Sequence, residues 1–205
     1  MTYAQFKALV QAYLHQEGNP KVSDQADQFI VLGEAAINRR VRTQQMLQTV
    51  LLSDLETGTP PTYPIPADYM EVYGIWDNNV SVDFVSVHEL RELGLQTTSS
   101  LATCPIRYSI LGGYFVFSKT PGDEATLTYY AKPDALSSFA GDITAPLFNR
   151  HQDLYLYSAM TEAAPFLRDE QRGQYWQQNR ERIFQEIRLE NWDARAPKAQ
   201  PLKVR

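Results

Sequence analysis

Cysteine is almost absent from this 205-residue chain, which contains only Cys104. A single cysteine excludes a disulfide framework within the chain and a zinc site built from several thiolates. Histidine is nearly as scarce, and His15, His88 and His151 lie in three separate segments with no partner at metal-ligand spacing. We therefore expect no metal site.

Long apolar runs are also missing. Arg, Glu or Pro interrupts each apolar segment well before the roughly 18 residues that a membrane-spanning helix needs. The first residues, Met1 to Gln5, lack the basic flank and apolar run of a secretory signal. Together with the single cysteine, these absences predict a soluble protein made in a reducing cytosol, without a membrane partner.

Basic residues are in deficit. The chain has 19 Lys and Arg against 24 Asp and Glu, a formal net charge of -5, which argues against a general DNA-binding protein. Four bases (Arg195, Lys198, Lys203 and Arg205) and one acid give the segment from Asp193 to Arg205 a charge of +3, so the remainder carries -8. We interpret this as a basic arm on an acidic body, although a solvated tail would have the same composition.

Catalytic motifs are missing as well. Cys104 precedes Pro105 without a nearby base, which favours an inert thiol over a nucleophile. The serine pairs lie in predicted loops that lack the G-x-S-x-G elbow, and Gly112-Gly113 lacks the Lys and Ser/Thr of a phosphate-binding loop. The sequence therefore predicts a protein that is not an enzyme and that has no catalytic residues and no cofactor.

What is present is helical spacing at both ends of the chain. Apolar residues recur every three or four positions from Tyr3 to Leu14, which predicts a first helix that Gly18-Asn19-Pro20 ends. Ser23 or Asp24 is expected to cap a second helix. Its predicted buried stripe comprises Ala26, Phe29, Ile30, Gly33, Ile37 and Val41.

Helical spacing returns after Pro133. We expect one helix from Thr144 to about Leu167, bent or ended by Pro165, and a last helix capped by Asp169. From Leu154 onward the first of these is apolar almost all round, which indicates burial in the bundle or between subunits. The candidate subunit-interface residues are Tyr155, Tyr157, Met160, Trp176 and Phe184.

The middle of the chain has the alternation and turn residues of β-structure. Asp77-Asn78-Asn79 and Gly112-Gly113 predict hairpin turns, and Ser86-Val87-His88-Glu89 predicts a short capped helix. The predicted strand segments are Met46–Leu55, Met70–Trp76, Val80–Val85, Arg107–Leu111, Tyr114–Ser118 and Thr126–Ala131.

These patterns predict an α+β fold. Residues 1–45 and 134–192 are expected to form an antiparallel helical bundle, with residues 46–133 as an inserted antiparallel β domain. Residues 193–205 contain two prolines and no apolar periodicity, so we expect an extended C-terminal arm.

Two features exceed what an ordinary globular domain needs. The first is the aromatic content of 12 Tyr, 9 Phe and 3 Trp, which suits a partly hydrated interface, although a tyrosine-rich core would also account for it. The second is the arm, whose Leu202 and Val204 alternate with cations, a pattern that fits a groove or an acidic sheet edge of a partner.

Three segments occur in an order and spacing that resemble a known family. They are Tyr63–Val72 (YPIPADYMEV), Tyr114–Pro121 (YFVFSKTP) and Leu127–Pro133 (LTYYAKP), the last followed by Leu136-Ser137 and then by the helix of Leu, Tyr and Ala between Leu147 and Leu167. From about Thr2 to Trp192 the chain resembles the head-to-tail adaptor (connector or gatekeeper) proteins of tailed bacteriophages, especially the short-tailed type.

The resemblance implies a virion structural protein of the neck, assembled in the host cytoplasm. Such adaptors form a twelvefold ring beneath the portal protein, extend the DNA channel and carry the next tail component, a nozzle or tail tube. Genomic DNA would pass through the channel without sequence-specific binding. The bundle would pack side by side in the ring, the β domain would face outward or toward the tail, and the arm would enter the portal. The implied portal-binding residues are Arg195, Lys198, Pro201, Leu202, Lys203, Val204 and Arg205.

Two other classes of protein stay open at this stage. One is a non-enzymatic oligomeric interaction module, another virion or regulatory subunit that is not tied to a portal. The other is a cryptic hydrolase or ligand-binding protein, which would need carboxylates or histidines clustered around one deep pocket.

Overall fold

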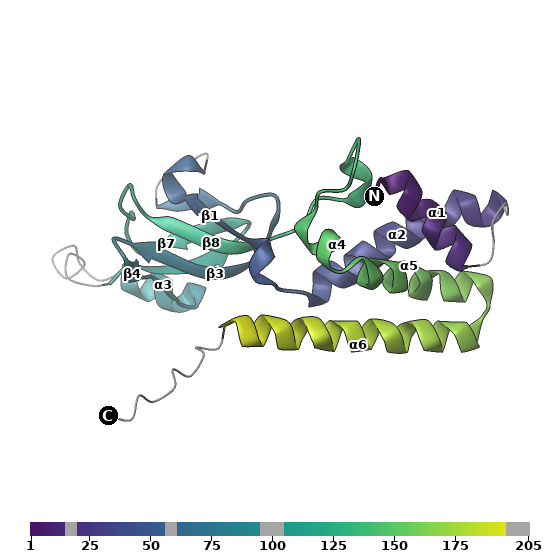
Figure 1. Cartoon of the computed structure of the whole chain (residues 1–205). Coiled ribbons are helices and arrows are strands. Elements are labelled where there is room, and N and C mark those ends of the chain that lie inside the picture. Colours follow the sequence, from purple (N-terminus) through teal and green to yellow (C-terminus); the bar gives the residue numbers. More distant parts are fainter. Residues whose placement is uncertain (15–19, 56–60, 95–104, 196–205) are drawn as a thin grey trace, which may run out of the picture. The chain divides into compact units, whose positions relative to one another are not determined.

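The computed structural model describes residues 1–14, 20–55, 61–94 and 105–195. Its chain divides into two compact units (Figure 1): a helical unit of Met1–Gln45 and Pro133–Arg205, and a β unit of Met46–Lys132. Helices lie at both ends of the chain with strands between them, so the predicted α+β class is confirmed.

The helical unit is built around one central helix, α5, which packs against both α2 and α6. Burial of α5 on several sides is as the sequence predicts, since Leu154, Tyr155, Ala159 and Met160 are all buried. Its helices are α1 (Tyr3–Tyr13), α2 (Pro20–Arg40), α4 (Pro146–Arg150), α5 (Gln152–Leu167) and α6 (Glu170–Arg195), with a 3-10 turn, η3, at Leu136–Ser138.

The N-terminal helices follow the sequence pattern except at one boundary. Thr2 caps α1 by accepting a hydrogen bond from the Gln5 amide, and the six residues of the predicted α2 stripe are all buried. However, α2 begins at Pro20 instead of at a Ser23 or Asp24 cap. Proline suits a first helical turn because its fixed φ is helical and the missing N–H would have no helical partner there. The expected end of the first helix at Gly18 lies outside the described residues.

The predicted helix from Thr144 to Leu167 is interrupted. His151 has φ -132° and ψ 56°, and this non-helical residue separates α4 from α5. The separate α4 turns Phe148 into the core, where its ring packs edge-on against Phe6 and Tyr155, both at centroid distances of 5.2 Å. Pro165 lies in the last turn of α5, as expected of a residue that ends a helix.

The last helix begins as predicted but ends later. The Asp169 carboxylate accepts a hydrogen bond from the Arg172 amide at 3.0 Å, which confirms the cap of α6. The predicted arm starts at residue 193, whereas Asp193 to Arg195 continue α6. Ala194 and Arg195 are good helix formers, and the first residue that disfavours a helix is Pro197.

The β unit contains two four-stranded sheets, with orders β1-β8-β3-β4 and β2-β7-β6-β5. Their inner faces share one core, formed by large residues of both sheets such as Ile75, Leu127, Tyr108 and Phe115. The strands are β1 (Leu47–Leu51), β2 (Thr62–Pro64), β3 (Tyr69–Asp77), β4 (Val80–Ser81), β5 (Asp83–Phe84), β6 (Arg107–Leu111), β7 (Tyr114–Phe117) and β8 (Thr126–Ala131). Short 3-10 turns, η1 (Gln44–Met46) and η2 (Leu52–Asp54), adjoin β1.

The expectation of a purely antiparallel β domain is wrong at one place. The predicted strand Val80–Val85 is divided into β4 and β5, which belong to different sheets, and β5 pairs with β6 in parallel. Val82 separates the two short strands, and its side chain is buried in the shared core. The chain therefore passes from one sheet to the other at Val82, where burial of the side chain in the shared core stabilises the crossing.

Local turn chemistry is confirmed elsewhere in the β unit. Asn78 and Asn79 have positive φ between β3 and β4, and Gly112 and Gly113 do between β6 and β7, as two-residue hairpin turns require. The Ser86 hydroxyl accepts a hydrogen bond from the Glu89 amide at 3.2 Å and so caps helix α3 (Val87–Gly94).

Candidate functional site

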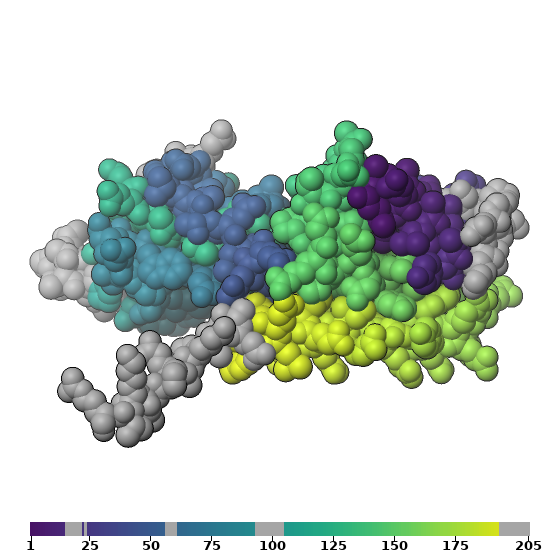
Figure 2. Space-filling model, viewed as in Figure 1, coloured from purple at the N-terminus to yellow at the C-terminus, as the bar shows by residue number. Residues whose placement is uncertain are grey.

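Helix α6 has one buried and one exposed face. Trp176, Ile183 and Ile187 pack into the helical unit, whereas Tyr175, Leu189 and Trp192 are exposed on the opposite side. Figure 2 shows α6 running along one side of this unit. Between the exposed apolar residues, the helical spacing places uncharged glutamines on the same outer face: Gln171, Gln174, Gln178 and Gln185.

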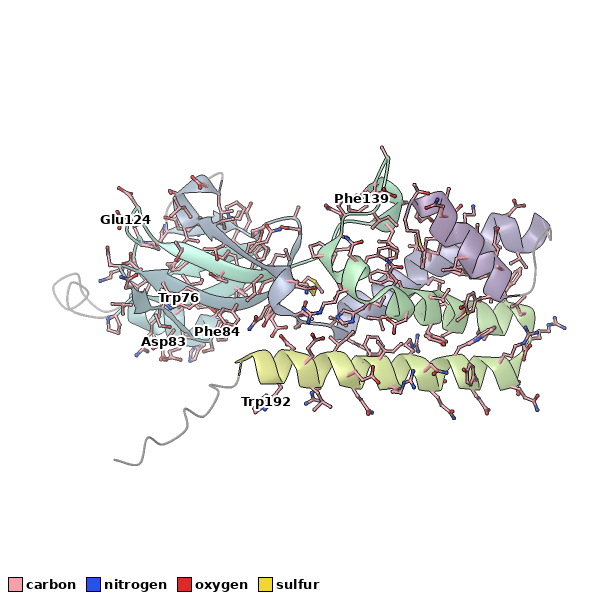
Figure 3. The ribbon with its side chains drawn as sticks, viewed as in Figure 1. Trp76, Asp83, Phe84, Glu124, Phe139 and Trp192 are labelled. Atoms are coloured by element: carbon pink, nitrogen blue, oxygen red, sulfur yellow. The ribbon has the colours of Figure 1, made fainter. Side chains whose placement is uncertain are left out.

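The strongest exposed apolar feature lies at the end of α6. Trp192 is 71% exposed and Leu189 64%, and with Arg188 they form what we name the terminal patch. Trp192 projects from the side of α6 that faces away from the other helices (Figure 3). The three residues line a groove together with Arg40, Val41 and other residues at the end of α2. An exposed tryptophan beside an arginine is typical of protein-binding surfaces.

Contacts between α2 and α6 hold this groove in shape. The Arg40 guanidinium lies over the Phe184 ring, 4.2 Å from its centroid, and pairs with both carboxylate oxygens of Glu181. Hydrogen bonding to Arg40 lowers the pKa of Glu181, and the same bond raises the pKa of Arg40. The Asn191 amide donates to the Arg42 carbonyl at 2.7 Å. These contacts between the end of α2 and α6 fix the backbone on which the terminal patch lies.

The charge around the groove is mostly positive. Arg42 donates at 2.7 Å to the carbonyl of Asn38, in the last turn of α2, and to that of Val41, the residue after the helix. Arg188 forms no ion pair within the residues described here. The exposed patch thus combines a large apolar surface with an uncompensated cation.

A small polar pocket lies beside this groove, lined by Thr43, Arg150, His151 and Glu190 among others. The His151 ring lies 3.9 Å from the Glu190 carboxylate, which also pairs with Arg150. Burial lowers the pKa of His151, Asp153 opposes that shift, and Arg150 adds to it. The Thr43 hydroxyl is buried and has no hydrogen-bond partner in the described part of the chain. The pocket brings together neither a thiol nor a set of three metal ligands.

The other histidines do not extend this pocket. His88 is exposed and lies 3.2 Å from Glu92, while His15 and Cys104 fall outside the described residues. Over residues 1–14, 20–55, 61–94 and 105–195, no three His, Cys, Asp or Glu side chains are placed to hold a metal ion. Among those same residues no helix has the length and apolar character to cross a membrane.

Four of the five candidate interface residues lie inside the helical unit. Tyr155, Met160, Trp176 and Phe184 are buried within a single chain, which leaves them little surface to offer a second copy. Tyr157 is only partly buried. That a second subunit contacts these residues stays a prediction.

Tyr157 belongs to a group of tyrosines from three helices. Burial raises the pKa of Tyr157, and its neighbours Tyr175 of α6 and Tyr13 of α1 add to the shift. Tyr13 and Tyr175 are both at least half exposed. We call these three residues the tyrosine cluster; of the three, the sequence analysis named only Tyr157 as an interface candidate.

The predicted portal-binding residues are placed only at their beginning. Arg195 lies in the last turn of α6, and the other six, Lys198, Pro201, Leu202, Lys203, Val204 and Arg205, lie outside the described residues. Sequence reasoning missed Leu189 and Trp192. Their three-residue spacing, on the face opposite to Trp176 and Ile187, was the signal that could have identified them.

Comparison with known proteins identifies the family. No curated protein matches the chain. The family model described as SU10 adaptor protein matches residues 1–205, which is the whole sequence. This is a family of phage head-to-tail adaptors, structural components of the virion, so the resemblance seen in the strand segments is confirmed. The chain with the exposed terminal patch at the end of its last helix belongs to the SU10 adaptor protein family.

Proposed function

We propose that this adaptor forms a ring beneath the portal, extends the DNA channel and carries the next tail protein. The observation that supports portal docking best is the terminal patch, with Trp192 exposed beside Arg188 just before the basic segment. The family membership supports a structural adaptor, and the patch gives that adaptor a surface suited to protein binding.

The chemistry of the patch specifies what the portal surface must offer. Burying Trp192 and Leu189 on association removes two large apolar side chains from water, which favours binding. Arg188 calls for a carboxylate on the partner, since a cation buried without one would oppose association. We therefore expect an apolar portal groove that is bordered by acidic residues.

The arm would extend the same contact. Arg195 ends α6 three residues after Trp192, and Leu202 and Val204, which alternate with Lys203 and Arg205, supply further apolar anchors. The proposed arm residues that follow α6 are Lys198, Pro201, Leu202, Lys203, Val204 and Arg205. Binding of any extended segment costs conformational freedom, so a rigid patch beside it increases the affinity of the whole contact.

Ring contacts would use the outer surface of the helical unit. A closed ring needs two different complementary surfaces on each subunit. The tyrosine cluster and the glutamine-rich outer face of α6 carry few charges, and the exposed Arg182 and Glu186 on that face pair with each other. A neighbouring subunit would therefore cover this surface without burying an unpaired charge. Twelve subunits would match the ring that the family resemblance implies.

The acidic body suits a channel for DNA. Outside residues 193–205 the chain carries a net charge of -8. A lumen of that sign repels phosphate, so DNA passes without the strong, salt-dependent adhesion of a basic surface.

Sedimentation tests the proposal directly. The purified adaptor is mixed with the portal ring from the same genome, and we expect comigration at one adaptor per portal subunit. A Trp192→Ala variant should bind the portal about 30-fold more weakly, as loss of an interface hot spot of about 2 kcal/mol does. Arg188→Glu should weaken binding further at low salt.

Tyr114→Ala is the matched control, because it removes an exposed aromatic residue from the β unit. It should leave portal binding unchanged. If wild-type protein fails to comigrate with the portal at low salt, the portal assignment is wrong, and an oligomeric interaction module with another partner replaces it. Equal portal binding by Trp192→Ala and Tyr114→Ala would remove the terminal patch from the contact.

A further inference from the structure

Strand β1 forms one edge of its sheet. Among the described strands it pairs only with β8, in an antiparallel register that places Leu47 opposite Tyr130 and Leu51 opposite Thr126. Hydrogen-bonded and non-hydrogen-bonded pairs alternate along such a ladder. Once one hydrogen-bonded pair is known, the alternation shows which N–H and C=O groups of β1 point away from β8, toward the open edge of the sheet.

The Leu52 amide fixes this alternation. It donates to the Ala125 carbonyl at 2.8 Å, in register with the β1–β8 ladder, so Val50 and Gln48 are the bonded residues of β1. Thr49 then directs both its N–H and its C=O away from β8. The Thr49 and Thr128 hydroxyls lie 2.8 Å apart, which agrees with a non-hydrogen-bonded pair, where side chains approach closely. The alternation therefore leaves both backbone groups of Thr49 outside the β1–β8 ladder.

The other sheet edges are protected. β4 and β5 have two residues each, and β2 has three, of which Pro64 lacks an N–H. Short edges and proline are common ways of preventing strand addition. β1 has five residues, Leu47-Gln48-Thr49-Val50-Leu51, with neither a charge nor a proline. β4 pairs only with Trp76 and Asp77 of β3, but the rest of the outer side of β3 is broken by two register shifts and carries Glu71. Among the described strands β1 is therefore the least protected edge.

We propose that β1 accepts an extended strand of the next tail protein, which adds to the sheet beside Thr49. This inference rests on the proposed adaptor function, since it assigns the tail-binding mode of the β unit. The incoming segment is free of proline and of charge. It pairs its backbone with Thr49 and places an apolar side chain beside Val50, which packs against the core of the β unit.

A second copy of the chain is a poorer occupant. Two β1 edges that pair with each other are related by a twofold axis, which a single ring of adaptors does not contain. Among the other described edges, β2, β4 and β5 are too short to serve as the donor strand of a neighbouring subunit, and the outer side of β3 is interrupted by two register shifts and by Glu71. A different protein that brings its own extended segment needs neither a twofold axis nor a donor strand from the adaptor.

Residue-resolved hydrogen exchange of the wild-type chain tests the proposal. In the free protein the Thr49 and Leu51 amides should exchange quickly, whereas those of Gln48 and Val50 are protected by β8. In tail-bearing particles all four should be protected, with Thr49 slowed by about tenfold or more. Fast exchange at Thr49 in finished particles overturns the proposal. Protection that arises in purified adaptor, as its concentration rises, assigns the edge to a second copy and also overturns it.

A pair of substitutions separates the edge from the portal contact. Both Thr49→Pro and Thr49→Val remove the threonine hydroxyl. Thr49→Pro also removes the N–H that points away from β8, without breaking a hydrogen bond to β8, whereas Thr49→Val keeps that N–H. Adaptor–portal complexes are incubated with the tail proteins of the same genome. Thr49→Pro should dock on the portal normally and bind the tail protein about tenfold more weakly than Thr49→Val.

The outcomes are distinguishable. Equal tail-protein binding by the two Thr49 variants overturns the edge proposal while portal docking stands. Failure of both variants and of the wild type to dock on the portal contradicts the proposed function instead. If Thr49→Pro does not fold, the hydrogen exchange of the wild-type chain still tests whether a strand adds to β1.

Discussion

The guanidinium of Arg40, at the end of α2, lies over the Phe184 ring of α6, with its central carbon 4.2 Å from the ring centroid. The same guanidinium pairs with Glu181, one helical turn before Phe184. Two attractive contacts thus converge on one side chain and join α2 to α6 next to the terminal patch. The geometry of the patch depends on this junction.

Replacing Arg40 should loosen that junction. Arg40→Ala removes the cation–π contact and leaves Glu181 without its partner, so the free energy of unfolding should fall by about 1 kcal/mol. Arg40→Lys keeps the charge but not the planar stacking, and its loss should be smaller. Urea denaturation measures both. Arg39→Ala, at an exposed neighbour, is the control; a loss equal to that of Arg40→Ala would show that the junction contributes nothing specific.

The approach of α2 to α5 gives a second prediction. A Cβ atom added at Gly33 would lie 2.8 Å from the backbone nitrogen of Ala159, a distance at which one helix must move. Gly33→Ala should therefore destabilise the protein by about 1–3 kcal/mol, although alanine is the better helix former. Gly141→Ala is the matched control, because a Cβ there meets nothing within 4 Å. A Gly33→Ala variant as stable as Gly141→Ala would contradict the close packing of these helices.

Sequence patterning was sufficient where local chemistry and burial agree. The α2 stripe from Ala26 to Val41, the Asp169 cap and the two hairpin turns each depend on residues close together in the chain. It was insufficient where tertiary packing decides. His151 interrupts a continuous helical pattern because Phe148 packs between Phe6 and Tyr155, and no nearby residue indicates this.

In the candidate site, too, tertiary packing decided what the local sequence pattern could not. Tyr155 and Met160 were expected at an interface because their helix lacks a polar face, but a central helix inside one chain has that pattern too. The terminal patch was overlooked because single exposed apolar residues are common on helices. The spacing of Leu189 and Trp192 places them on one helix face, and their position beside Arg188 and the end of α2 makes them part of one surface.

The half-buried His151 ring predicts a pH dependence of stability. Its pKa in the folded chain is lowered, mainly by burial, so the folded state takes up a proton at lower pH than the unfolded state does. As pH falls through about 6.5, the ordinary value for histidine, the unfolded state therefore binds more protons and the free energy of unfolding decreases. Between pH 7.5 and 5.5 the wild-type protein should lose stability for this reason.

His151→Gln should flatten that dependence, because glutamine does not titrate. Urea denaturation at several pH values between 7.5 and 5.5 measures the slope for each protein. Asn149→Gln, at an exposed residue that does not titrate, is the control and should keep the wild-type slope. The Asp153 carboxylate works in the opposite direction, since it raises the pKa of His151. A steeper slope in Asp153→Asn than in the wild type would show that opposition directly, whereas identical slopes for the wild type and His151→Gln would mean that burial of the ring has no effect on its titration.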